Sequence, residues 1–237
     1  MSGIFHFKQF SIDQRNCAMK VNTDGVLLGA LCSSARPNRI LDIGTGTGLI
    51  SLMLAQRFKN AKVDAVEIDF AAAETAGMNF RNSVFSSNLN VINSSIEDYF
   101  MKSEENYDLI VSNPPFFINS LKSESPGKVK ARHTDISFFE SILNGSESSL
   151  TKEGSLWLIL PLETSRLIKR MKTIGNSLRF QDEILISSFS DSIPHRSILK
   201  FGFGTDESLP EKLVIYEMQG VYSAEYRKLL SDFLTIF

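Results

Sequence analysis

Apolar residues along this chain fall into two alternating patterns. Short continuous apolar runs predict buried strands, whereas apolar residues that recur every three or four positions predict helices. The predicted strands are Arg39–Ile43, Lys62–Ile68, Leu89–Ile92, Tyr107–Ser112, Gly154–Leu160, Ile184–Ser188, Ile198–Phe203 and Leu213–Met218. The predicted helices are Val26–Cys32, Leu49–Phe58, Phe70–Ser87, Asp135–Leu150, Leu162–Ser177 and Ser223–Phe237. Strands that alternate with helices indicate an α/β protein with a mostly parallel sheet, whose ligands bind at the carboxyl ends of the strands.

The segment before the first parallel strand has a different pattern. Alternating aromatic residues in Phe5–Phe10 predict a short strand or hairpin. Residues 22–25, Asn-Thr-Asp-Gly, predict a turn in which Thr23 or Asp24 caps the next helix. Structurally, this segment would be a flap over one edge of the sheet. Functionally, Lys20–Asp24 would line the entrance to a cofactor site, and the sequence leaves both interpretations open.

The length and composition are typical of one globular domain. The chain has 237 residues, of which 43% are apolar and 22% are charged. We therefore expect a single domain, with residues 1–35 as the flap and first helix and residues 36–237 as the core. We also expect a monomer. The net charge of -2 excludes a bulk polycation, so any contact with nucleic acid must come from local basic patches.

The cysteines and histidines indicate the cellular compartment and argue against a metal site. Cys17 and Cys32 are too far apart for a redox or zinc pair, which indicates a reducing compartment. Met1–Phe10 has no long apolar core, and no apolar run approaches a membrane span, so we expect a cytoplasmic protein without membrane contact. No metal site is expected, because the histidines show no ligand spacing: His6, His133 and His195.

A glycine-rich turn follows the first parallel strand. Gly44, Gly46 and Gly48 permit a tight turn and a close approach of a ligand to the start of the next helix. The G-x-G-x-G spacing differs from that of dinucleotide binders and favours another adenosyl cofactor. Glu67 ends the next strand about 20 residues later, where an acidic residue accepts both ribose hydroxyls of an adenosyl group. The loop after the third strand, residues 93–98, would flank the adenine or, equally, start a capped helix.

The fourth strand leads into Asn113-Pro114-Pro115-Phe116. Two prolines fix φ and remove two N–H donors, and each holds the preceding residue in an extended conformation. The result is a stiff pair of acceptors, the Asn113 side-chain oxygen and the Pro114 carbonyl. Two acceptors aimed at an exocyclic NH2 favour the pyramidal form that attacks an electrophile, and Phe116 offers a face on which a base rests. The alternative is a proline-stiffened surface loop with one aromatic residue in the core.

Parallel strands bring these motifs to one edge of the sheet. The glycine turn, Glu67 and Asn113–Phe116 each follow a predicted parallel strand, so they converge at the carboxyl edge. This convergence is the strongest structural inference from the sequence. It places a candidate cofactor site beside a candidate amine site.

A basic segment follows the proline loop. Residues 119–132 are polar and include Pro126 and Gly127, which predicts a loop. Beside a base-binding loop, its cations would hold phosphates and become ordered on binding; otherwise they form a solvated face. The residues concerned are Lys122, Lys128, Lys130, Arg132 and His133.

Together, these motifs resemble a class I S-adenosylmethionine-dependent methyltransferase that acts on an amine. The chain is, more narrowly, similar to the bacterial tRNA1(Val) adenine-N6-methyltransferase family, and this resemblance covers nearly its whole length. Its specific blocks are Phe5–Phe10, Met19–Gly25, Ala131-Arg132-His133, Glu225-Tyr226-Arg227 and Asp232-Phe233-Leu234. The resemblance implies a Rossmann-like fold with a mostly parallel seven-stranded sheet, helices on both faces and an antiparallel strand near the C-terminus.

That family methylates the exocyclic amine of the adenine just 3′ of the anticodon. The resemblance therefore implies tRNA as the partner and S-adenosylmethionine as the cofactor. It implies that Asn113 and Pro114 orient the amine, that Phe116 stacks the base, and that Lys122–His133 faces RNA. It assigns the cofactor to Thr23, Asp24, Asp42, Gly44, Gly46, Gly48, Glu67, Ser95, Ile96 and Asn113. The loop after the third strand often carries an aspartate for the adenine, but this chain has Ser94-Ser95-Ile96, so Ser95 and the backbone would make that contact.

The same pair of acceptors also serves other nucleophiles. Methylation of a protein glutamine amide or of an rRNA guanine amine is the alternative within the enzymes. A non-catalytic RNA-binding module is the alternative of another class, and the intact glycine turn, Glu67 and proline loop argue against it.

Overall fold

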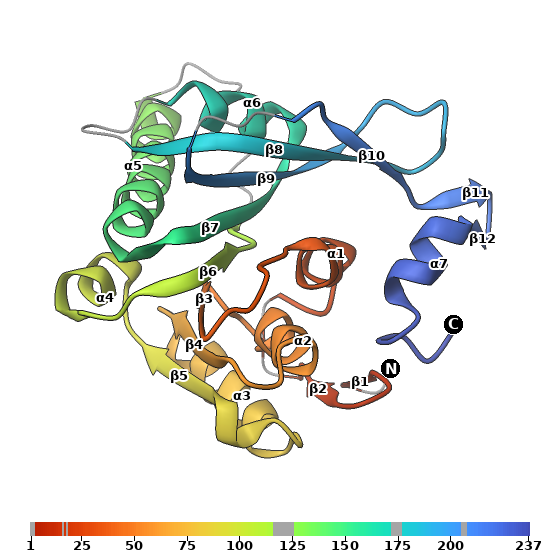
Figure 1. The fold of residues 1–237 in the computed structure, drawn as a ribbon, viewed down its shortest axis with the longest axis horizontal. Coiled ribbons are helices and arrows are strands. Elements are labelled where there is room, and N and C mark those ends of the chain that lie inside the picture. The colour runs from red at the N-terminus through yellow and green to blue at the C-terminus, as the bar shows by residue number, and fades with distance from the viewer. Residues whose placement is uncertain (1–2, 16, 18, 116–125, 172–176, 205–207) are drawn as a thin grey trace.

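One large sheet forms the centre of the protein (Figure 1). The computed structural model describes residues 3–15, 17, 19–115, 126–171, 177–204 and 208–237, with side chains for all of these except 126–135. The strand order is β10-β8-β9-β7-β6-β3-β4-β5, and β9 is antiparallel to both of its neighbours while the other pairs are parallel. The strands are β3 (Arg39–Ile43), β4 (Lys62–Glu67), β5 (Leu89–Asn93), β6 (Tyr107–Ser112), β7 (Leu150–Pro161), β8 (Leu178–Ser187), β9 (Arg196–Phe203) and β10 (Glu211–Val214).

The Rossmann-like, mostly parallel sheet is confirmed, but it has one strand more than the seven that the family resemblance implies. The structure has eight strands in the central sheet over the described residues. The edge strand β10 pairs in parallel with β8, so that Leu213 lies opposite Ile186. The predicted run Leu213–Met218 therefore divides, because its second half leaves the central sheet and forms β11 (Tyr216–Met218) with β12 (Val221–Tyr222).

Helices cover both faces of the central sheet. One hydrophobic cluster joins the sheet to α1 (Thr23–Leu31), α2 (Leu49–Arg57), α3 (Phe70–Arg81) and α7 (Ala224–Leu230). The other cluster joins it to α4 (Ile96–Lys102), α5 (Pro126–Ser149) and α6 (Leu162–Arg170). Because both faces of the sheet are buried, its strands do not alternate between apolar and polar residues. They appear in the sequence as continuous apolar runs.

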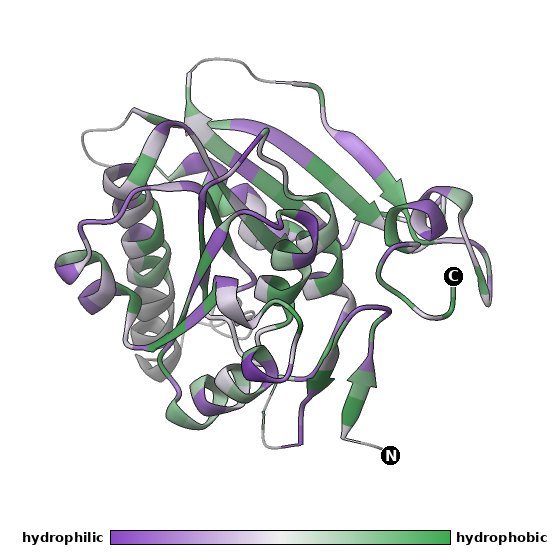
Figure 2. Ribbon diagram, turned by 60° about the horizontal axis from the view of Figure 1, so that its bottom comes forward, coloured by the Kyte–Doolittle hydropathy of each residue, from purple (hydrophilic) through white to green (hydrophobic). Residues whose placement is uncertain are grey.

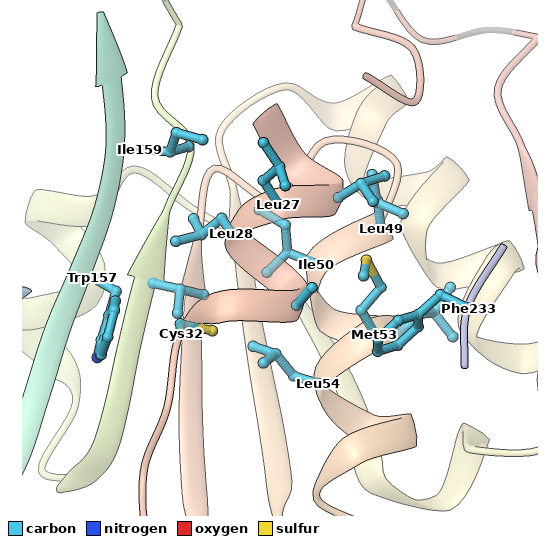
Figure 3. Packing of buried hydrophobic residues seen from close by; sticks show 14 of the residues in the cluster. Leu27, Leu28, Cys32, Leu49, Ile50, Met53, Leu54, Trp157, Ile159 and Phe233 are labelled. Atoms are coloured by element: carbon cyan, nitrogen blue, oxygen red, sulfur yellow. The ribbon is translucent and has the colours of Figure 1, made fainter. Parts of the chain in front are cut away.

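Strand β7 shows how one apolar run supplies two cores. Trp157 and Ile159 point toward α1 and α2 (Figure 3), whereas Leu156, Leu158 and Leu160 belong to the cluster with α5 and α6. Successive strand residues face opposite sides of a sheet, so this division follows from the strand period of two. Trp157 is a core residue and is 4% exposed.

The two ends of the chain lie outside the central sheet on the same side of the molecule (Figures 1 and 2). The predicted N-terminal hairpin is present as β1 (Ile4–His6) and β2 (Ser11–Asp13), which pair antiparallel. The Lys8 ammonium group donates to the backbone oxygens of Ser231 at 2.5 Å and Phe237 at 2.8 Å. The residue Phe7 also forms an isolated bridge with Leu234, so the hairpin is fastened to the C-terminal segment.

Several element boundaries differ from the sequence prediction. Residues 126–132, expected in a loop, form the first turns of α5, because a proline fits the first turn of a helix, where its missing N–H is not needed. Helix α1 begins at Thr23, and its cap is Asn22, whose side chain accepts from the Gly25 N–H at 2.8 Å, rather than Thr23 or Asp24. Three further helices end earlier than predicted: α3 ends at Arg81, α6 at Arg170 and α7 at Leu230.

Within the glycine turn, close packing against Phe80 requires a glycine at position 48. Its φ is +82°, and a Cβ there would lie 2.4 Å from the Phe80 ring. We expect Gly48→Ala to lower the free energy of unfolding by about 2–4 kcal/mol, because about 1–2 kcal/mol of left-handed strain adds to overpacking. Urea denaturation measures this change. Gly46→Ala is the control: it carries similar strain at φ +58° but meets nothing within 4 Å, so its loss should be about 1–2 kcal/mol. Equal losses of unfolding free energy in the two variants would show that the Phe80 ring moves aside at no cost in free energy.

Candidate active site

The sheet register brings the predicted site motifs together. Ile43, the last residue of β3, lies opposite Val66 of β4 on one side and Ser112 of β6 on the other. The glycine turn, Glu67 and Asn113 follow these residues directly, so they are neighbours at the carboxyl edge of the sheet. The predicted convergence of the three motifs is thus present in the structure.

Glu67 and the glycine turn are joined by hydrogen bonds. The Gly46 N–H donates to Glu67 Oε2 at 2.9 Å, and the Asp69 N–H donates to Oε1 at 3.0 Å. Each carboxylate oxygen keeps a lone pair for a further donor. Gly44 and Gly46 have φ of +70° and +58°, and a Cβ at either position would meet nothing within 4 Å. The turn therefore presents open backbone beside an oriented carboxylate.

Asp42 lies under the glycine turn and is fully buried. Its Oδ2 accepts from the Thr45 hydroxyl at 2.7 Å, and from the Ser51 hydroxyl at 2.7 Å and backbone N–H at 3.1 Å. Its Oδ1 is buried and has no hydrogen-bond partner among the described residues. Burial raises the pKa of Asp42 to about 6, against the lowering effect of the hydrogen bonds from Ser51 and Thr45. An unpaired carboxylate oxygen of this kind suits a cationic donor.

The raised pKa of Asp42 predicts a pH dependence of stability. An aspartate binds its proton below about pH 4 when unfolded but below about pH 6 here, so the folded state holds more protons between these values. The free energy of unfolding of the ligand-free protein should therefore fall by about 3 kcal/mol from pH 4 to pH 7 through this group. Urea titrations of the wild type and Asp42→Asn, which keeps the acceptor, isolate the contribution as the difference between two pH curves. Parallel curves would contradict the raised pKa.

Asn113 presents a second unpaired acceptor at the same edge. Its side chain is 8% exposed, and its Oδ1 is buried without a hydrogen-bond partner among the described residues. A buried amide oxygen normally has a donor, so this atom is poised to accept from a bound group. Pro114 is also buried, while Phe116 lies outside the described residues.

The start of α1 borders Asn113. A Cβ added to Gly25 would lie 3.7 Å from Asn113 Nδ2 and 3.5 Å from the Oδ1 of Asn22. Thr23 is exposed, and the half-buried Asp24 accepts from Arg196 Nε at 2.8 Å. The N-terminal block is therefore part of the rim around Asn113, which favours the functional interpretation of Lys20–Asp24 without assigning a role to Thr23 or Asp24.

Sequence reasoning missed the part played by Arg196. The ion pair Arg196–Asp24 joins residues 172 positions apart and fixes the start of β9 to the start of α1. No local sequence motif predicts an ion pair between residues that far apart. Next to it, partial burial and the Arg196 charge lower the pKa of His195, while Asp24 opposes this change.

The remaining predicted residues are placed less completely. The Ser95 hydroxyl caps α4 by accepting from the Asp98 N–H at 3.1 Å, and Ile96 is buried in the core. The helix-start interpretation of this loop is therefore correct, and adenine contacts there remain a prediction. Lys122 lies outside the described residues, and for Lys128, Lys130, Arg132 and His133 only the backbone is described, in the first turns of α5.

Metal-ligand clusters and membrane-spanning helices are absent from the described part of the chain. No group of three or more potential metal ligands occurs there. None of the described helices is long and apolar enough to cross a membrane.

Comparison with known proteins identifies the family. Residues 20–174 match the family model of the methyltransferase small domain. The tRNA1(Val) (adenine(37)-N6)-methyltransferase of Pedobacter heparinus is 47% identical over 237 residues, which cover 100% of both chains. This chain belongs to the tRNA1(Val) (adenine(37)-N6)-methyltransferase family. Relatives of the same name from Christiangramia forsetii and Citrobacter koseri are 39% and 36% identical, over 97% of this chain and 96% and 94% of theirs.

Solved structures support the fold of this methyltransferase. A predicted O-methyltransferase from Agrobacterium tumefaciens superposes with a TM-score of 0.67 at 19% identity, over 89% of this chain and 96% of the other. The ribosomal protein L11 methylase of Lactobacillus delbrueckii subsp. bulgaricus gives a TM-score of 0.53 at 14% identity, over 76% and 78%. These likenesses concern the Rossmann-like fold alone.

The residues at the carboxyl edge fit S-adenosylmethionine, the methyl donor of this methyltransferase family. The open backbone at Gly44 and Gly46 admits a ligand without a clash. Glu67 retains lone pairs for the ribose hydroxyls, and the unpaired Oδ1 of Asp42 suits the ammonium group of the methionine part. The individual contacts are predictions.

Proposed function

We propose that this protein transfers the methyl group of S-adenosylmethionine to the N6 amine of an adenine in tRNA, namely adenine 37 of tRNA1(Val). The name of the relatives supports the substrate, and one structural observation supports the chemistry. That observation is the buried and unpaired Oδ1 of Asn113, beside the open glycine turn. A preorganised acceptor at this point binds a donor amine next to the cofactor.

The proposed mechanism depends mainly on positioning. S-adenosylmethionine supplies an electrophilic methyl group on a cationic sulfur. Asn113 Oδ1 and the Pro114 carbonyl accept hydrogen bonds from the two N–H groups of the amine. The nitrogen lone pair is then no longer delocalised into the ring and points at the methyl carbon. Transfer to the amine nitrogen would form the new C–N bond while the C–S bond of the donor breaks and its electron pair stays on sulfur. The methylated amine then loses one proton to water, so the chain needs no strong base. Holding the three reacting atoms in line is the protein's contribution.

The base must leave its stack before it reaches Asn113. We propose that Phe116 stacks the extruded adenine and that the basic segment from Lys122 to His133 holds the flanking phosphates. We also propose that the protein works in the cytoplasm, as a monomer in a single domain. Light scattering with and without tRNA tests the oligomeric state.

The deciding experiment uses total tRNA from cells that lack this protein. Incubation with the protein and labelled S-adenosylmethionine, followed by nucleoside analysis, should place the label in N6-methyladenosine. Label absent from tRNA while the cofactor still binds would overturn the tRNA assignment and direct attention to an rRNA guanine amine or a protein glutamine amide. Failure of the protein to bind the cofactor would overturn the enzymatic assignment and leave a non-catalytic RNA-binding module.

A further inference from the structure

The C-terminal part of the chain forms an aromatic pocket, and the proposed chemistry does not use this pocket. It has a volume of about 340 Å³ and is lined by Phe189, Tyr216, Gln219, Gly220 and Tyr222. The Phe189 and Tyr216 rings lie 5.8 Å apart between centroids, and the Tyr216 and Tyr222 rings stack at 5.0 Å with an interplanar angle of 23°. The three rings are half-buried, so part of each remains open to a ligand in the pocket.

The pocket has a rigid support behind it. Tyr222 stacks on the buried Tyr226 at 5.2 Å, with an interplanar angle of 9°. Phe237 packs edge-on against both of these rings, at 5.1 Å and 6.1 Å. This support spares a ligand the cost of ordering the aromatic faces.

The pocket lies on the same edge of the sheet as Asn113. Strands β8 and β10 run parallel to β6 through the intervening β7 and β9, so their carboxyl ends point the same way. The Tyr216 N–H donates to the Ser188 carbonyl at 2.9 Å, just beyond the end of β8. Four strand spacings separate β6 from β10, a lateral distance of roughly 19 Å at about 4.8 Å for each spacing. A substrate held at Asn113 would need several nucleotides to reach the pocket.

The rim between the two sites is continuous. Arg196 begins β9 opposite Ile186 of β8, and it holds Asp24 at the start of α1, whose Gly25 borders Asn113. The loop that joins β8 to β9 carries Ile193 on this rim with 84% of its surface exposed. The rim therefore runs from Asn113 through the Arg196–Asp24 pair to the aromatic pocket.

We propose that this pocket binds a second nucleobase of the RNA substrate, several nucleotides from the one that is methylated. The proposal rests on the proposed function, since it concerns how the same RNA is held. Aromatic faces stack on any base, and the Gln219 amide is placed to hydrogen-bond to a base edge. The pocket lining contains no charged residue, which suits a base rather than a phosphate. Its small volume suits one base rather than a long ligand. Unpaired bases of an RNA loop are the ones free to enter such a pocket.

Replacing Tyr216 tests this proposal. Tyr216→Leu should weaken the binding of tRNA about tenfold or more, because stacking on an aromatic side chain contributes at this scale. Tyr216→Phe, which keeps the ring, should bind tRNA like the wild type. The affinity for S-adenosylmethionine should change in neither variant. The matched control is Phe85→Leu, which removes a half-buried ring near the amino end of β5, on the opposite edge of the sheet. Fluorescence anisotropy with labelled tRNA and calorimetry with the cofactor provide these affinities.

A second variant leaves the packing of the rings intact. Gln219 is exposed, so Gln219→Glu adds a negative charge at the mouth of the pocket without removing a ring, and it should weaken tRNA binding several-fold. Asn60→Asp adds the same charge at an exposed turn before β4, far along the opposite edge, and should have little effect.

The outcomes separate the pocket from the activity. Unchanged tRNA affinity in Gln219→Glu, or in a folded Tyr216→Leu, would overturn the pocket proposal while methylation by the wild type upheld the proposed function. A wild type that binds the cofactor but neither binds nor methylates tRNA would overturn the proposed function, and the pocket proposal with it.

Discussion

Replacing Asn113 with alanine is expected to lower kcat for methyl transfer by about 100- to 1,000-fold, the usual effect of removing one preorganised group that acts in the transition state. The reason is the position of its Oδ1, which is buried at the carboxyl end of β6 with no hydrogen-bond partner among the described residues. Burial of that acceptor is costly unless a donor arrives. The amine of the substrate would be that donor, and alanine cannot bind it. Single-turnover kinetics with saturating tRNA measure the chemical step directly.

The affinity for S-adenosylmethionine separates this role from a general disturbance of the site. It should stay within about threefold of the wild type in Asn113→Ala, because Asn113 is only one of the expected cofactor contacts and two others, Gly46 and Glu67, are hydrogen-bonded to each other. Asn113→Asp keeps an oxygen acceptor and should retain more activity than the alanine variant. Asn82→Ala, at an exposed position at the end of α3, is the matched control. Loss of transfer and of cofactor affinity together in Asn113→Ala would refute the assigned role.

Most of the fold could be predicted from the sequence because its elements are strongly patterned. The core strands β3 and β6 have the predicted boundaries, since each is an apolar run with polar or glycine-containing segments around it. The expected loop around Pro126 was wrong because proline is compatible with the first turn of a helix as well as with a loop. Strand β10 was merged with β11 because their separation follows from pairing with β8, a tertiary contact that no local pattern encodes.

The same division holds for the candidate site. Glu67 and the glycine turn could be placed together because parallel strands deliver their ends to one edge. The Arg196–Asp24 pair could not be found this way because its members lie 172 positions apart. The aromatic pocket could not be found either, because Phe189, after β8, joins residues of the β11–β12 hairpin. The Asp42 and Asn113 oxygens that lack a partner among the described residues also required the structure, since no sequence pattern shows which neighbours surround a buried atom.

Replacing Glu67 with alanine is expected to weaken the binding of S-adenosylmethionine on the order of 100-fold, with little further change in kcat at saturating cofactor. Glu67 accepts two backbone N–H groups through separate oxygens, which fixes the carboxylate at the mouth of the glycine turn. Hydrogen bonds from ribose hydroxyls to an oriented carboxylate contribute about 1.5–3 kcal/mol each, and a tenfold change in affinity corresponds to about 1.4 kcal/mol. Calorimetric titration of the wild type and Glu67→Ala with S-adenosylmethionine measures the loss.

A double-mutant cycle distinguishes a ribose contact from a mere disturbance of the glycine turn. An analogue of the cofactor that lacks the 2′-hydroxyl should bind the wild type about tenfold more weakly than the natural compound, because it leaves a Glu67 oxygen without its donor. Glu67→Ala should bind the two compounds about equally, since the acceptor is already absent, and the coupling energy should exceed about 1 kcal/mol. If Glu67→Ala discriminates against the analogue as strongly as the wild type does, the carboxylate acts only by ordering Gly46, and the ribose must be held by other groups.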